Sequence, residues 1–124
     1  MPVQMKRAYE DPESSDGKRY LVDRLWPRGV KREALEIDDW LKELAPSTEL
    51  RRWFNHDPRL WDEFQGRYAD ELENDDARAL LDRLAAESSS ATVTLVFGAK
   101  DEAHSNAAFL KRLIEGRQTT SRKH

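Results

Sequence analysis

The chain of 124 residues contains no cysteine. The absence of thiols excludes a disulfide scaffold, a thiolate nucleophile, a thiolate zinc site and an iron–sulfur cluster. No apolar run approaches the roughly 18 residues that a membrane span needs, and no apolar signal segment opens the chain. The sequence therefore predicts a soluble cytoplasmic protein that does not engage a membrane.

No strong excess of either charge is present, because 21 basic and 24 acidic residues give a formal net charge of −3. This balance argues against a general nucleic-acid coat. Four Trp, four Phe and three Tyr supply enough apolar area for one core, and the length is that of one ordinary domain. We predict a single domain over residues 1–116 and a disordered polar tail over residues 117–124, and the oligomeric state is left open.

Metal-binding and nucleotide-binding motifs are also missing. The three histidines include no pair at ligand spacing, so no metal site is predicted. Neither a phosphate-binding glycine loop nor a dinucleotide fingerprint occurs, and we predict no cofactor.

Three β-rich runs occupy residues 3–9, 20–26 and 92–97. The first alternates apolar and polar side chains, whereas the second is continuously apolar, as in an interior strand covered on both faces. An Asp-Gly turn signal in the 10–17 loop suits a hairpin. The direction of the first strand is therefore left open.

Helical periodicity fills the rest of the chain. Apolar side chains recur at spacings of three and four between Trp61 and Leu72. Capping candidates precede the helices at Ser47, Asp57, Asn74 or Asp75, and Ser105. The order strand, strand, helices, strand, helix predicts an α/β domain with a small, largely parallel sheet of three or four strands flanked by helices.

Residues 21–29 form the most informative segment. Asp23 and Arg24 interrupt an apolar run and need partners, because burying an unpaired charge is costly. Ligands of open α/β sheets bind beyond the carboxyl ends of the strands, where this segment falls. The predicted ligand-binding residues here are Arg24, Trp26, Arg28 and Gly29. The arginines would hold phosphate or carboxylate, the indole would form a wall, and the glycine would let the backbone turn and approach closely. The alternative is a structural knot in which Asp23 pairs with an arginine and Trp26 simply packs.

A second candidate segment, residues 98–106, follows the third β-rich run. A turn from a strand into a helix N-terminus suits an anion. Lys100 and Asn106 are predicted to bind the ligand, and His104 can donate or transfer a proton. The alternative is an ordinary polar loop with Ser105 as a helix cap. In a parallel sheet the two candidate segments share one edge.

The segment His56-Asp57-Pro58 offers another proton donor, although Asp57 is equally explained as a helix cap. No strong nucleophile is evident, so any chemistry is of the acid–base kind. The catalytic residues stay unknown, with candidates Asp23, His56, Asp57 and His104.

Residues 22–29, Val-Asp-Arg-Leu-Trp-Pro-Arg-Gly, resemble the YeaO-like family of small bacterial and archaeal proteins, which belongs to domain of unknown function 488. The resemblance covers roughly residues 4–115 and continues at residues 40–47, 49–57, 63–64, 71–72, 94–97 and 106–107. It implies a compact α/β fold that leans towards a parallel first strand. It implies no established reaction, substrate or cofactor.

Longer and more distant relatives carry a Cys-His-Arg run after the strand that resembles residues 93–97. This chain has Asn106-Ala107-Ala108 at that place, so chemistry performed by those three residues does not transfer. The family motif nevertheless includes many polar positions, which a pure packing role would not demand.

We therefore predict binding of a small anionic ligand, bearing phosphate or carboxylate, in a cleft at the carboxyl ends of the strands. Whether the protein is an enzyme stays open. One alternative is an acid–base enzyme of the hydrolase or transferase type. Another is a protein or nucleic-acid interaction module that uses the basic segment 17–32 or the tail.

Overall fold

Four short strands form one all-parallel sheet in the computed structural model, which describes residues 3–122. They are β1 (Val3–Arg7), β2 (Lys18–Leu21), β3 (Asp39–Trp40) and β4 (Val93–Phe97), in the order β1-β4-β2-β3. Strand β4 lies between β1 and β2, and Val93 is in register with both Val3 and Lys18. The predicted parallel sheet is confirmed, and the first strand runs parallel rather than in a hairpin.

The burial of β4 explains its central place. All five of its residues are buried, as expected for a strand that is covered on both faces. Strand β2 is shorter than the predicted run over residues 20–26. Its ladder continues to Val22, whose N–H donates to the Val96 carbonyl, and the chain then leaves the sheet at Asp23. The polar residues that follow thus lie in a loop beyond the strand end.

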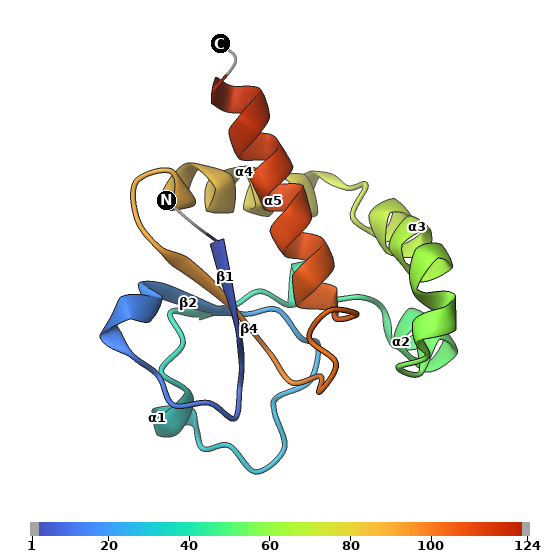
Figure 1. The fold of residues 1–124 in the computed structure, drawn as a ribbon, viewed down its shortest axis with the longest axis horizontal. Coiled ribbons are helices and arrows are strands. Elements are labelled where there is room, and N and C mark those ends of the chain that lie inside the picture. The colour runs from blue at the N-terminus through green and yellow to red at the C-terminus, as the bar shows by residue number, and fades with distance from the viewer. Residues whose placement is uncertain (1–2, 123–124) are drawn as a thin grey trace.

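Five α-helices flank the sheet within residues 3–122. They are α1 (Arg32–Leu35), α2 (Thr48–Phe54), α3 (Trp61–Glu71), α4 (Asp75–Ser88) and α5 (Asn106–Arg122). Helices α4 and α5 pack on one face of the sheet, whereas α1 lies on the other side (Figure 1). Helices α2 and α3 lie together beyond one end of the strands. None of the helices in the described part of the chain is long and apolar enough to span a membrane.

The predicted helix caps are confirmed. Ser47 Oγ accepts from the Leu50 N–H, and Asn74 Oδ1 accepts from the Ala77 N–H. Asp57 Oδ1 accepts from the Arg59 N–H at the start of the 3₁₀ turn Pro58–Leu60, which leads into α3. Ser105 Oγ accepts from the Ala108 N–H in the first turn of α5. Each cap satisfies a backbone donor that the helix itself cannot.

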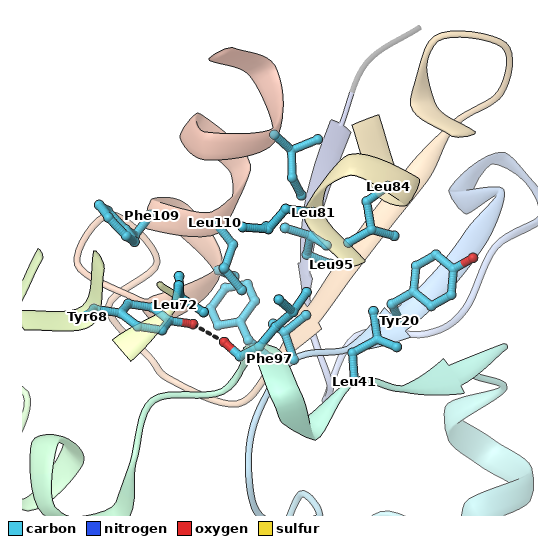
Figure 2. Close-up of a cluster of buried hydrophobic side chains, with 14 of the residues drawn as sticks. Tyr20, Leu41, Tyr68, Leu72, Leu81, Leu84, Leu95, Phe97, Phe109 and Leu110 are labelled. Carbon is cyan, nitrogen blue, oxygen red and sulfur yellow. Dashed lines mark hydrogen bonds between the residues drawn. The ribbon is translucent and has the colours of Figure 1, made fainter. Parts of the chain in front are cut away.

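The apolar side chains form two clusters, one on each face of the sheet. The larger cluster lies between the sheet and the helices, and Figure 2 shows its centre around Leu95 and Phe97. There the Tyr68 hydroxyl donates to the Leu44 carbonyl. The smaller cluster contains Leu21 and Val96 and is covered by the segment that holds α1. Adjacent residues of one strand, such as Leu95 and Val96 of β4, therefore pack into opposite clusters.

Residues 117–122, which the sequence assigned to the disordered tail 117–124, continue α5 in the structure. Two polar contacts tie this part of the helix to α4. Arg117 Nε donates to Asp82 Oδ1 at 2.9 Å, and the Gln118 amide donates to Ser88 Oγ. Residues 123–124 of the predicted tail lie outside the described residues.

Candidate functional site

A cleft of ≈ 980 Å³ opens beyond the carboxyl ends of β1, β2 and β4. Five segments contribute to its lining: Tyr9 after β1, residues 23–28 after β2, the loop 98–106 after β4, the segment 46–56 that contains α2, and Phe64 of α3. This is the edge of a parallel sheet at which the strand-to-helix connections converge. Both candidate segments from the sequence therefore reach the same cleft.

Asp23 contributes a carboxylate to this cleft and is held by neutral donors. Its Oδ2 accepts from the Gly98 N–H at 2.9 Å, and its Oδ1 accepts from Asn106 Nδ2 at 3.1 Å. Burial raises the pKa of Asp23 above the ordinary value for a carboxyl, although these two donors and the nearby Arg51 oppose the rise. The predicted alternative in which Asp23 pairs with an arginine is not what the described residues show.

Arg24 is anchored to the backbone of the segment before α2. Its Nε donates to the Pro46 carbonyl at 3.1 Å, and its Nη2 donates to the Ala45 carbonyl at 3.4 Å. The guanidinium lines the cleft, but part of its donor set is committed to these carbonyls. Arg24 therefore ties the loop after β2 to the start of α2.

Trp26 combines a packing role with a place on the cleft wall. Its Nε1 donates to the Val30 carbonyl at 2.6 Å, and its ring meets Trp40 edge-on at 5.4 Å between centroids.

Arg28 lines the cleft and is exposed. Gly29 does not line it. Its φ of 80° fits the predicted turn, but no atom lies within 4 Å of a Cβ placed there, so no close approach requires a glycine.

The loop after β4 places Lys100, His104 and Asn106 at the cleft. Asp101 Oδ2 bonds to His104 Nδ1 at 2.7 Å, which leaves His104 Nε2 as the ring nitrogen outside this pair. The hydrogen bond from His104 lowers the pKa of Asp101. A carboxylate that orients an imidazole in this way is a feature of acid–base sites. Asn106 serves instead to bridge the strand ends, because its Nδ2 donates to both the Val22 carbonyl and Asp23.

Helix α2 supplies two cations that the site prediction missed, Arg51 and Arg52, close to His56, which the sequence offered as a catalytic candidate. Arg51 and Arg52 lie on its last turns, and Asn55 and His56 follow it. Asn55 and His56 have φ values of 45° and 55°, a left-handed conformation that is uncommon for non-glycine residues. This pair turns the chain sharply at the cleft, as strained residues often do at functional sites.

Asp57 lies outside the lining. It caps the following 3₁₀ turn and also pairs with the guanidinium of Arg59, whose Nη2 lies 3.0 Å from Asp57 Oδ2. The Arg59 side chain is the main cause of the lowered pKa of Asp57. Of the catalytic candidates, the structure thus brings Asp23, His56 and His104 together and leaves Asp57 as a cap.

The charge of the cleft is opposite to that of the whole chain. Five cationic side chains line it, against only two carboxylates, Asp23 and Asp101. The cationic residues are Arg24, Arg28, Arg51, Arg52 and Lys100. Apart from Arg24, all are exposed, and none of the five forms a salt bridge with any residue in the range 3–122. A concave surface of this charge attracts anions.

The arrangement of the His, Asp and Glu side chains in residues 3–122 does not favour metal binding. Within residues 3–122 no group of three or more His, Asp or Glu side chains is arranged to hold a metal ion.

Comparison with known proteins places the chain in a family. A family model described as the inactive DUF488-N3 subclade matches residues 2–124. Uncharacterised proteins of Mycobacterium bovis and Mycobacterium tuberculosis are each 43% identical over 115 residues, or 93% of this chain and 95% of theirs. The uncharacterised protein YeaO of Escherichia coli is 41% identical over 110 residues, or 89% of this chain and 94% of its own. No solved structure matches.

These matches confirm the resemblance carried by residues 22–29. Because the family model covers nearly every residue and the relatives align over nearly their full lengths, the chain belongs to the inactive DUF488-N3 subclade.

Proposed function

We propose that the protein binds a small anionic ligand, bearing phosphate or carboxylate, in the cleft at the carboxyl ends of the strands. The observation that carries this proposal is the group of exposed cations without salt bridges: Arg28, Arg51, Arg52 and Lys100. An acidic protein gains nothing in stability from gathering like charges in one concavity, because they repel one another. Their convergence is explained if an anion neutralises them.

The four exposed cations have different parts in this binding. The guanidinium groups of Arg28, Arg51 and Arg52 offer paired N–H donors that match two oxygens of a phosphate or carboxylate. Lys100 adds a point charge from the opposite loop. Arg24 acts mainly by fixing the loop after β2 against the start of α2.

Binding without turnover also agrees with the family description, in which the subclade is called inactive. The family resemblance implies that more distant relatives carry a cysteine, a histidine and an arginine at the place where this chain has Asn106, Ala107 and Ala108. A cleft that carries cations but lacks these residues is suited to hold an anion rather than to convert it.

A thermal-shift measurement tests the proposal with inorganic phosphate, nucleotides and small carboxylates at low salt. A ligand present at 100 times its Kd adds about 2.7 kcal/mol to the free energy of unfolding, which raises the Tm of a domain of this size by about 10 °C. We expect such a shift for the unmodified chain and its loss in Arg51→Ala. The control is Lys18→Ala, which removes an exposed cation at the amino end of β2, away from the cleft.

Equal shifts for Arg51→Ala and the unmodified chain would place binding elsewhere. Tm values that none of these anions changes would show that the cleft is not an anion site.

A further inference from the structure

The negative charge of the Asp23 carboxylate is unfavourable in a cleft that binds anions. It lies among cationic side chains, and it repels the anion that they attract. Burial also raises its pKa, so the ionised form is disfavoured where it stands. A residue that served packing alone would not need a charge at this position.

The hydrogen bonds to Asp23 leave part of its acceptor capacity unused. An ionised carboxylate accepts about four hydrogen bonds, and described residues supply one to each oxygen, from Gly98 and from Asn106. Gly98 permits this close arrangement, since a Cβ there would lie 3.3 Å from Asp23 Oδ2. Asp23 lines the cleft, so its carboxylate can accept further hydrogen bonds from a ligand there.

The charges around Asp23 limit which ligand groups can donate a hydrogen bond to its carboxylate. An ammonium group on the ligand would be repelled by the five cations of the lining. A neutral hydroxyl has no such penalty and forms a strong hydrogen bond to an ionised acceptor. The cleft of ≈ 980 Å³ is also far larger than a phosphate group, and its volume is that of a site for a whole metabolite.

We propose that the ligand is a hydroxylated phosphomonoester of the sugar phosphate class, whose phosphate lies among the cations and whose hydroxyls donate to Asp23. This inference rests on the proposed function and narrows it. Asp23 then distinguishes a sugar phosphate from a phosphate that carries no hydroxyls.

Isothermal titration calorimetry on the full chain tests this with ribose 5-phosphate and n-butyl phosphate. Both are phosphomonoesters, but only the first carries hydroxyls. One charge-assisted hydrogen bond predicts that ribose 5-phosphate binds at least about tenfold more tightly. In Asp23→Asn we expect this preference to fall below about twofold, while n-butyl phosphate binds as tightly as before or more tightly, because a negative charge has been removed.

Asp11→Asn is the control, since it removes the same amount of charge from an exposed carboxylate that does not line the cleft. It should keep the preference for ribose 5-phosphate. A Gly98→Ala variant gives a second way to disturb Asp23, because the added methyl lies against Oδ2. It should lower the preference without removing any charge.

Equal affinity of the unmodified chain for the two probes would overturn this inference and leave the proposed anion site intact. An equal loss of affinity for both probes in Asp23→Asn would also overturn it, since that pattern belongs to a structural residue. If neither phosphate binds at any concentration tested, both this inference and binding of phosphates in the cleft fail. The comparison on the unmodified chain decides the role of hydroxyls even if Asp23→Asn does not fold.

Discussion

Tyr68 shows how a single polar atom is accommodated in this core. It is among the largest fully buried side chains in residues 3–122, and its hydroxyl donates to the Leu44 carbonyl (Figure 2). Burial raises the pKa of Tyr68 well above that of a free tyrosine. The hydroxyl therefore stays protonated and keeps α3 joined to the segment before α2.

Removing only this hydroxyl, in Tyr68→Phe, should lower the free energy of unfolding by about 1–3 kcal/mol. The ring still fills the same space, but the Leu44 carbonyl loses its donor in a buried place. Urea unfolding followed by fluorescence measures the change. Tyr9→Phe is the control, because Tyr9 is 50% exposed, and it should unfold like the unmodified chain. Equal midpoints for both variants would contradict the role given to the Tyr68 hydroxyl.

Single residues were predicted from the sequence where the local pattern was enough. The cap at Asp57 follows from an acid directly before proline, and it was expected. The left-handed backbone at His56 has no such signature, because histidine adopts it only where the surrounding structure requires it. The partners of Asp23 also escaped prediction, since Gly98 and Asn106 reach it only after β2 and β4 have paired.

At the scale of elements, α2 is a short helix that places Arg51 and Arg52 in the lining of the cleft. Its first turn is fastened to the end of α3. Ser47 N–H donates to Glu71 Oε1 at 2.8 Å, and Ser47 Oγ donates to Glu71 Oε2 at 2.6 Å. Ser47 Oγ also accepts from the Leu50 N–H at 3.0 Å. One serine thus both caps α2 and sets its position relative to α3.

Replacing this serine, in Ser47→Ala, should cost about 1 kcal/mol of unfolding free energy, the usual effect of losing an N-cap. The loss of the Glu71 contact adds little, because that carboxylate is exposed. Thermal denaturation gives the comparison with Thr48→Ala, which alters the next exposed residue and leaves the cap in place. The role of Ser47 would be refuted by a Tm for Ser47→Ala as high as that of Thr48→Ala.

The elements themselves were predictable in proportion to their length. Helices α2, α4 and α5 begin directly after the predicted caps, and the apolar stripe predicted between Trp61 and Leu72 coincides with α3. Strand β3, with two residues, and helix α1, with four, are too short to show a period. The orientation of α2 was equally hidden, because a helix of seven residues does not reveal which side will face a cleft made by other segments.

For the whole molecule, one buried charge cluster links the first two strands. Asp16 pairs with Arg19 at 2.6 Å and with Lys6 at 3.2 Å, and both Asp16 and Arg19 are only 3% exposed. Burial alone would raise the pKa of Asp16, but the Glu13 N–H, Lys6 and Arg19 outweigh it and hold the pKa below its ordinary value. Lys6 belongs to β1 and Arg19 to β2, and these strands do not pair with each other.

A lowered carboxyl pKa stabilises the fold above the unfolded-state pKa, and this contribution disappears as the pH falls through the folded-state pKa. Part of the unfolding free energy should therefore be lost below about pH 4. Asp16→Asn should have a flatter profile in that range and be less stable at pH 7 by about 3 kcal/mol, because it leaves Arg19 buried without its counter-charge.

Urea unfolding at a series of pH values checks both effects, with the exposed loop residue variant Asp11→Asn as the control. A profile for Asp16→Asn that parallels the unmodified chain would contradict the assignment of acid sensitivity to this cluster.

The strand order has a consequence for how the protein is made. Strands β1 and β2 leave the ribosome first, yet each pairs with β4, which is synthesised much later. Pairings between segments so distant in the chain form slowly and leave apolar strands uncovered in the meantime. The nascent chain thus carries unpaired strands until residues 93–97 emerge, and the loop that closes the cleft follows directly behind them. Folding and the creation of the cleft therefore wait for residues 93–106, and a growing chain needs protection from aggregation until they have emerged.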